Sequence, residues 1–188
     1  MSDALSVPNI QQLPAPQTEA KSASAVPGTE QFLRLNLFSD TTVLLPVELL
    51  SEVLTIETGQ IVPIPHLPGW VMGVYNWRGD VLWMVDLGHL CGLVPWYRQS
   101  SNLSNFSAVV MQSGDRRTAS AQAKNQMLGL VVNRVEDIEW CDPTLIQPLP
   151  PSTVTPEFAR FLWGYWWKPG GDMLAVLNKD AILTAMPK

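Results

Sequence analysis

Residues 71–86 read VMGVYNWRGDVLWMVD, and this stretch decides the fold. Two apolar runs, 71–77 and 81–85, flank the tripeptide Arg78-Gly79-Asp80. Apolar runs of strand length separated by a short glycine-containing segment are typical of a β-hairpin. The stretch therefore predicts two strands joined by a tight turn. We expect Gly79 to serve the turn and Gly73 to allow close packing.

A second stretch, LWGYWWKPGGDMLAVLN (162–178), repeats this pattern. The alignment places three pairs of residues on one another: Gly73 on Gly164, Gly79 on Gly170 and, with one inserted glycine, Asp80 on Asp172. Upstream, LLPVELLSEV (44–53) aligns with GLVVNRVEDI (129–138). One order of elements that occurs twice indicates a duplicated architecture. We expect two pseudo-repeated halves, about 31–94 and 106–186, that form two small all-β modules around a shared core.

Alternation and breaker residues place the remaining elements. Strands are expected over 32–38, 42–47, 106–111, 127–133, 135–140, 161–167 and 173–177. Residues 48–54 fit either a helical turn or a strand. Short helices are expected at 87–91 and 178–186, the second with Asn178 as its N-cap.

Composition separates a tail from a folded body. Residues 1–30 hold four prolines and no aromatic residue, so they cannot bury enough surface to offset their ordering entropy. We expect a disordered tail over 1–30 and one domain over 31–188. The loop at 113–125 is also expected to be long and mobile.

Charge and targeting signals limit the partners. The chain of 188 residues is 46% hydrophobic and 15% charged, with a formal charge of −5, so a phosphate backbone would be repelled and nucleic acid is not expected as a ligand. No signal peptide or membrane-spanning run is visible, and the lone thiols Cys91 and Cys141 suit a reducing compartment. These features predict a cytoplasmic protein without direct membrane insertion.

The motifs of enzymes and metal sites are missing from the sequence. It has no phosphate-binding glycine loop and no nucleophile elbow, and His66 and His89 have no histidine or cysteine at metal-ligand spacing. We therefore expect no catalytic, metal or cofactor-binding residues, and no cofactor. The eight tryptophans exceed what such a core needs, and exposed tryptophan commonly anchors protein contacts. A binding module is the leading class.

The stretch PGWVMGVYNWRGDVLWMVDL (68–87) resembles the signature of the chemotaxis coupling proteins, the CheW-like family. The residues that carry the resemblance are Asn76, Arg78, Gly79, Val85, Asp86 and Leu87. It extends over nearly all of 31–186, although Trp77 stands where an aliphatic residue is usual. The resemblance implies two five-stranded β-barrels around a shared core, with short helices and a C-terminal helix.

The resemblance also implies a function. Members of the family are non-catalytic adaptors that join the cytoplasmic tip of methyl-accepting chemoreceptors to the regulatory domain of a CheA-type histidine kinase. The output would be flagellar, pilus-driven or light-directed motility. The implied partner-binding residues are Arg78, Asn76, Trp77, Glu52 and Asp86.

Three points stay open at the level of sequence. Arg78 could instead pair with an acid of its own chain, such as Asp80 or Asp86, and Glu52 could be plain solvated charge. The implied kinase contact is mainly apolar and cannot be assigned among Leu45, Val47, Val53 and Leu54. The alternative function is a ligand-sensing β-barrel with a Trp-lined pocket, which would require the tryptophans to line one cavity. A cofactor-free enzyme is the third and least favoured function.

Overall fold

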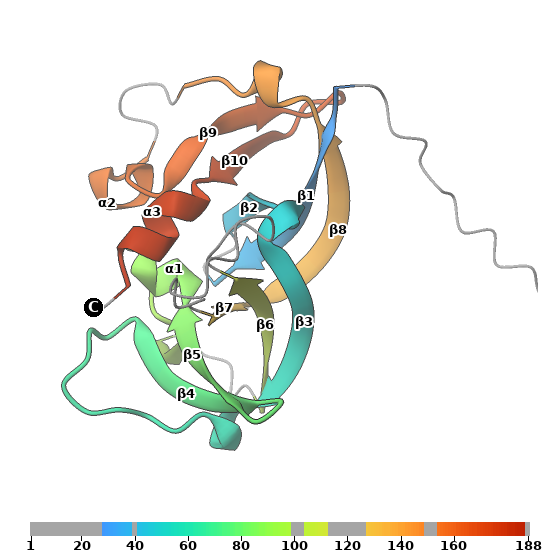
Figure 1. Ribbon diagram of the computed structural model, residues 1–188. Helices are drawn as coiled ribbons and strands as arrows, with labels where there is room; N and C mark the ends of the chain where they lie inside the picture. Colours follow the sequence, from blue (N-terminus) through green and yellow to red (C-terminus); the bar gives the residue numbers. More distant parts are fainter. Residues whose placement is uncertain (1–27, 39–40, 99–103, 113–126, 149–153, 187–188) are drawn as a thin grey trace, which may run out of the picture.

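The computed structural model describes residues 28–38, 41–98, 104–112, 127–148 and 154–186 (Figure 1). The all-β expectation is confirmed, because two five-stranded sheets make up most of the described chain. The strands are β1 Glu30–Leu37, β2 Thr41–Pro46, β3 Leu50–Glu57, β4 Val71–Trp77, β5 Asp80–Asp86, β6 Asn105–Gln112, β7 Met127–Val132, β8 Arg134–Cys141, β9 Leu162–Trp167 and β10 Met173–Leu177. The helices are α1 Leu87–Leu90, α2 Pro156–Ala159 and α3 Lys179–Thr184, and four 3₁₀ turns are η1 Val47–Leu49, η2 Thr58–Gln60, η3 Trp96–Arg98 and η4 Pro143–Leu145.

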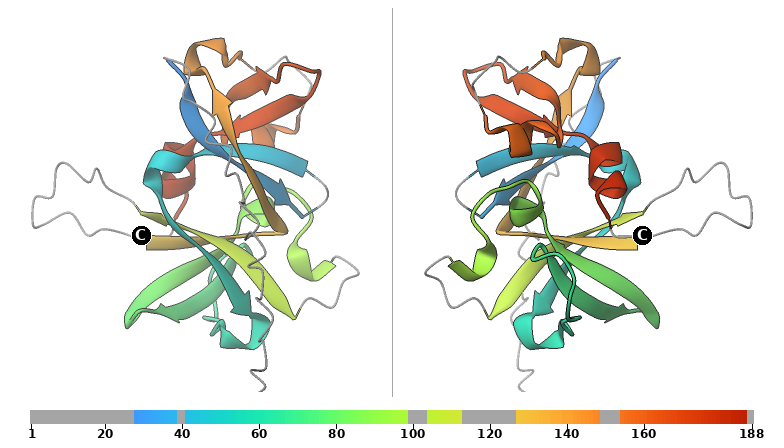
Figure 2. Two further views of the ribbon diagram at one scale, coloured as in Figure 1. Left: turned by 90° about the vertical axis from the view of Figure 1, so that its right-hand side faces the viewer. Right: turned by 90° about the vertical axis from the view of Figure 1, so that its left-hand side faces the viewer.

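The two sheets exchange strands between the two halves of the sequence. The first sheet has the order β8-β1-β2-β10-β9, and the second has the order β3-β6-β7-β5-β4. The two orders are equivalent, because each strand of β1–β5 takes the place that the corresponding strand of β6–β10 has in the other sheet. Each sheet therefore takes two strands from one half and three from the other. Figure 2 shows the blue, orange and red strands of the first sheet above the green strands of the second.

The repeated hairpins adopt the same local geometry. In each, the strand after the glycine makes one isolated bridge to the preceding loop: Val62 with Val74, and Gln147 with Tyr165. A Cβ at Gly73 would lie 2.2 Å from the Val62 carbonyl oxygen, and one at Gly164 would lie 2.3 Å from that of Gln147. The two glycines therefore let a loop backbone lie directly against the strand, which is the role expected for Gly73.

Three apolar clusters hold the body together. The largest lies between the sheets and takes Leu33, Leu35 and Leu37 from β1 together with residues such as Leu130 of β7. A second lies within the second sheet and includes Ile56, Leu82 and Phe106, and a third lies within the first sheet and includes Phe32, Trp166 and Leu174. Both faces of each central strand are therefore buried, and the expected shared core is the interface between the two sheets.

The expectation of closed barrels is wrong. The described residues contain no ladder that joins the outer strands β8 and β9, or β3 and β4. Side chains span each gap instead: Lys168 Nζ lies 2.5 Å from Glu139 Oε1, and Trp77 Nε1–H donates to Glu52 Oε2 at 3.2 Å. In each curled sheet, a glutamate carboxylate on one outer strand thus accepts a hydrogen bond from a donor at the opposite edge.

The short elements follow their local signals. Asn178 caps α3 as expected, because its Oδ1 accepts the amide N–H groups of Asp180 and Ala181. Residues 48–54 contain both of the expected alternatives, the end of η1 and the start of β3. The expectations for most of the tail and for the 113–125 loop concern residues outside the described ranges.

Replacing Gly73 by alanine should lower the stability of the fold strongly. Its φ of +142° disfavours a side chain, and the added Cβ would overlap the Val62 carbonyl. Together these effects should cost about 3 kcal/mol or more in the free energy of unfolding, measured by urea denaturation. Gly59→Ala is the control, because no atom lies within 4 Å of that Cβ. Equal midpoints for the two variants would contradict the close approach.

Both thiols should be unreactive in the native protein. Cys91 and Cys141 are buried, and burial raises the pKa of each thiol to about 12. The reactive thiolate is therefore scarce at pH 8. Ellman's reagent should detect no thiol in the native chain and two thiols after denaturation. Rapid native labelling would show that one of these sites is open to solvent.

Candidate partner-binding site

The turn between β4 and β5 presents Arg78 in a strained backbone conformation. Trp77 and Asp80 are paired across the hairpin, so Arg78 and Gly79 form a two-residue loop. Their φ angles are +53° and +89°, and positive φ at both positions is the mark of a type I′ turn. Asn76 Oδ1 accepts the Gly79 N–H at 3.1 Å. Gly79 therefore has the expected turn role, and Asn76 holds the turn in shape.

Arg78, Trp77 and Glu52 form one cluster at this end of the second sheet. Arg78 Nη2 donates to Glu52 Oε2 at 2.8 Å, and the same oxygen accepts the Trp77 indole N–H. The Arg78 Cζ lies 4.8 Å from the centre of the Trp77 ring, within range of a cation–π contact. The Arg78 side chain nevertheless stays 68% exposed. The guanidinium is thus oriented by two neighbours while most of it faces solvent.

Glu52 is the internal partner of Arg78. It lies on β3, and β3 and β4 are the opposite edges of the second sheet. The ion pair therefore joins the two edges that no ladder connects. The acids considered from sequence were Asp80 and Asp86, and the structure places neither of them in an ion pair with Arg78. Sequence reasoning could not find this pairing, because β3 and the hairpin are separated by the long 58–70 segment.

Asp86 does not belong to an exposed contact surface. It is fully buried at the end of β5, where Oδ1 accepts the His89 N–H and Oδ2 accepts the Trp96 N–H, both at 3.0 Å. Burial raises the pKa of Asp86, and the two backbone donors oppose that shift. Its role is to cap α1 and tie the segment that holds Trp96, so it cannot contact a partner as the resemblance implied.

Exposed apolar side chains lie on the second sheet, which also carries the Arg78 turn. Of the four residues considered for an apolar contact, Leu45 is buried, Val47 and Leu54 pack against the core, and Val53 is 51% exposed. Val81 and Trp83 on β5 are exposed as well. Sequence analysis did not assign Val81. Its alternation with the buried Leu82 and Met84 is the signal that would have found it.

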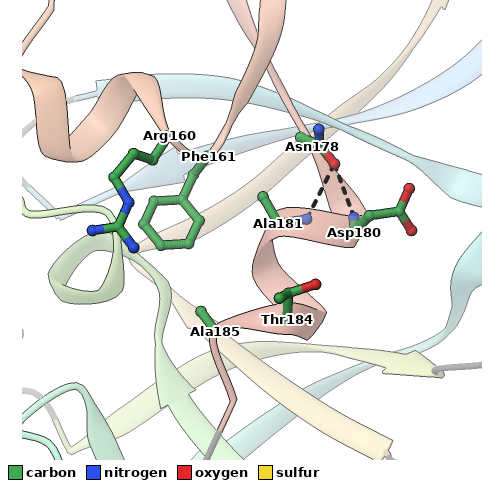
Figure 3. A pocket seen from close by; sticks show the side chains of 7 residues that line it. All are labelled: Arg160, Phe161, Asn178, Asp180, Ala181, Thr184 and Ala185. Atoms are coloured by element: carbon green, nitrogen blue, oxygen red, sulfur yellow. Dashed lines mark hydrogen bonds between the residues drawn. The ribbon is translucent and has the colours of Figure 1, made fainter.

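The tryptophans do not gather in one cavity. Trp83, Trp163 and Trp167 are exposed on strands of two different sheets, whereas Trp166 is buried beside Trp167, as alternation requires. A groove of about 290 Å³ near η3 contains Trp96 and no other tryptophan. A second, of about 400 Å³, contains none; there Arg160 and Phe161 lie across from α3 and its capping residue Asn178 (Figure 3). This distribution favours contact surfaces over a Trp-lined pocket.

Across residues 28–38, 41–98, 104–112, 127–148 and 154–186, no group of three or more His, Cys, Asp or Glu side chains is arranged to hold a metal ion. Within the same ranges, every helix is too short or too polar to cross a membrane.

Comparison with solved structures supports the fold. The crystal structure of the scaffolding protein TtCheW from Thermoanaerobacter tengcongensis superposes with a TM-score of 0.62 at 20% sequence identity. The match covers 80% of this chain and 89% of that one. At this identity the similarity establishes a common fold.

Sequence comparisons identify relatives. The chain is 32% identical over 120 residues to a chemotaxis protein CheW of Rhizobium meliloti, which is 64% of this chain and 67% of that protein. It is 31% identical over 99 residues to a probable chemotaxis protein CheW of Rhizobium etli, which is 52% of this chain and 55% of that protein. The matched stretches thus span about half to two thirds of these relatives. A family model described as CheW-like domain matches residues 31–186, and the chain belongs to this CheW-like domain family.

Proposed function

We propose that the chain is a non-catalytic adaptor that couples methyl-accepting chemoreceptors to a CheA-type histidine kinase. Membership of the CheW-like family across residues 31–186 supports this proposal, and two relatives carry the name chemotaxis protein CheW. The adaptor would work in the cytoplasm at receptor arrays. Its output would be flagellar, pilus-driven or phototactic motility.

The receptor contact is assigned to the cluster of Arg78, Trp77 and Glu52, and the single observation that carries it is the exposed but oriented guanidinium of Arg78. Arginine loses less entropy on binding when its fork is already held in place, and tryptophan beside it adds apolar area. Asn76 and Gly79 contribute by fixing the turn. A receptor tip that offers a carboxylate or a carbonyl would fit the free face of the guanidinium.

The kinase contact is assigned to the exposed apolar side chains of the second sheet, Val53, Val81 and Trp83. Apolar side chains on a sheet surface lose contact with water when a similar sheet packs on them, and large aromatics contribute most. Val53 follows Glu52 on β3, so the two side chains point to opposite faces of the sheet. The adaptor function would require both contacts to be accessible in the same molecule.

Charge reversal at Arg78 should weaken receptor binding. In Arg78→Glu, the partner acid meets a carboxylate, so the affinity for a receptor-tip fragment should fall about tenfold or more, measured by calorimetry. Arg134→Glu is a matched control, because Arg134 is 67% exposed and also pairs with a glutamate at 2.8 Å, but lies on the first sheet. Unchanged affinity of Arg78→Glu, or an equal loss in both variants, would refute the assigned contact.

The same substitution should leave the fold nearly intact. An exposed ion pair contributes about 1 kcal/mol or less. The unfolding midpoints of Arg78→Glu and Arg134→Glu should therefore lie close to that of the unsubstituted chain in urea. A loss of several kcal/mol in Arg78→Glu alone would mean that the Arg78–Glu52 pair supports the sheet instead of a partner contact.

A further inference from the structure

An aromatic face lies on the first sheet, away from the contacts assigned above. Trp163, Tyr165 and Trp167 alternate along β9 and therefore point to the same side. Trp163 is 49% exposed and Trp167 is 52% exposed. On β10, Met173 is paired with Trp167 and is exposed too. Among the described residues, these four form the aromatic face of β9 and β10.

The repeated strand has no aromatic residue at these three positions. The repeat aligns Trp163, Tyr165 and Trp167 with Met72, Val74 and Asn76 on β4. The Trp167 and Tyr165 rings meet edge to face, with centroids 6.2 Å apart, so the two rings form one continuous aromatic surface. Exposed apolar clusters of this kind usually mark a site of interaction.

Rows of exposed tryptophan and tyrosine suit proline-rich segments. Such segments adopt a polyproline helix that is already extended and carries little entropy to lose, and they bind aromatic surfaces. From residue 163 to residue 167, β9 rises about 13 Å. From its first to its fourth residue, a polyproline helix rises about 9 Å, which covers most of that row. The sequence Leu13-Pro14-Ala15-Pro16 in the N-terminal segment of this chain has four residues, two of them proline.

The N-terminal segment joins the body at β1, which is linked through β8 to the end of β9. Glu30 is paired with Cys141, and Phe32 is paired with Glu139. Glu139 in turn binds Lys168, which directly follows Trp167 in the sequence. Eleven residues lie between Pro16 and Gly28, and a chain of that length spans about 20 Å on average, so Pro16 can reach surfaces about that far from Gly28.

We propose that the segment Leu13–Pro16 docks as a polyproline helix on the aromatic face formed by Trp163, Tyr165, Trp167 and Met173 of the same molecule. The proline rings lie on the indole and phenol rings, and Leu13 adds apolar contact. The chain thereby covers its own exposed aromatic surface. This role is additional to the adaptor function and does not depend on it.

A spin label on the full-length chain tests the proposal. Gln11→Cys supplies one reactive site for a nitroxide, because both native thiols are buried. The tryptophans are labelled with fluorine and assigned by Trp163→Phe, Trp167→Phe and Trp83→Phe. We expect the nitroxide to broaden the fluorine signals of Trp163 and Trp167 several-fold, and to spare Trp83, an exposed tryptophan of the other sheet.

Two further samples decide the outcome. Adding Pro14→Ser and Pro16→Ser to the labelled chain should remove the broadening, with an unchanged circular dichroism spectrum. A mixture of spin-labelled chains without fluorine and fluorine-labelled chains without nitroxide should show no broadening. The proposal is overturned if Trp163 and Trp167 are broadened no more than Trp83, if the proline substitutions have no effect, or if the mixture is broadened as strongly, since the segment would then dock on another copy.

Discussion

The structure depends on the two passages of the chain from one sheet to the other. The chain leaves the first sheet after β2 and enters the second with β3, and it makes the reverse passage between β7 and β8. Neither half of the sequence can therefore complete a sheet alone. The leucines of β1 and the apolar residues of β7 meet in the core between the sheets because both sheets must fold together. The turn that carries Arg78 is held by this arrangement, since Glu52 belongs to a strand that has crossed over.

The unjoined edges explain why the candidate site lies where it does. Each sheet curls without closing, and a glutamate on the incoming strand binds a donor from the far edge: Glu52 with Trp77 and Arg78, and Glu139 with Lys168. At the first sheet the lysine is held between strands, and the hairpin carries aromatic residues. At the second sheet the guanidinium remains largely free. The same kind of ion pair between unjoined sheet edges thus occurs beside two chemically different surfaces.

Local signals made much of this fold predictable. The alternation around Arg78-Gly79 predicted the hairpin, the aligned glycines predicted a second one, and Asn178 predicted the start of α3, because each depends on neighbouring residues. The exchange of strands between the halves could not be predicted. The repeated sequence pattern would look the same if each strand paired only within its own half of the chain. The burial of Asp86 and the Arg78–Glu52 pair also depend on distant packing. The exposed position of Arg78 follows from turn geometry, whereas alternation says only that Trp166 and Trp167 face opposite sides, and packing decides that Trp167 is the exposed one.

The matching orders of the two sheets have a consequence for how such a chain can arise. Two copies of one five-strand unit that swap their last three strands would build the same body as a symmetric dimer. Fusing the two copies end to end would make the swap permanent and independent of protein concentration. Each unit would then be free to diverge, and one could keep Asn76 and Trp77 at its hairpin while the other acquired Trp167 and Lys168 at the aligned positions.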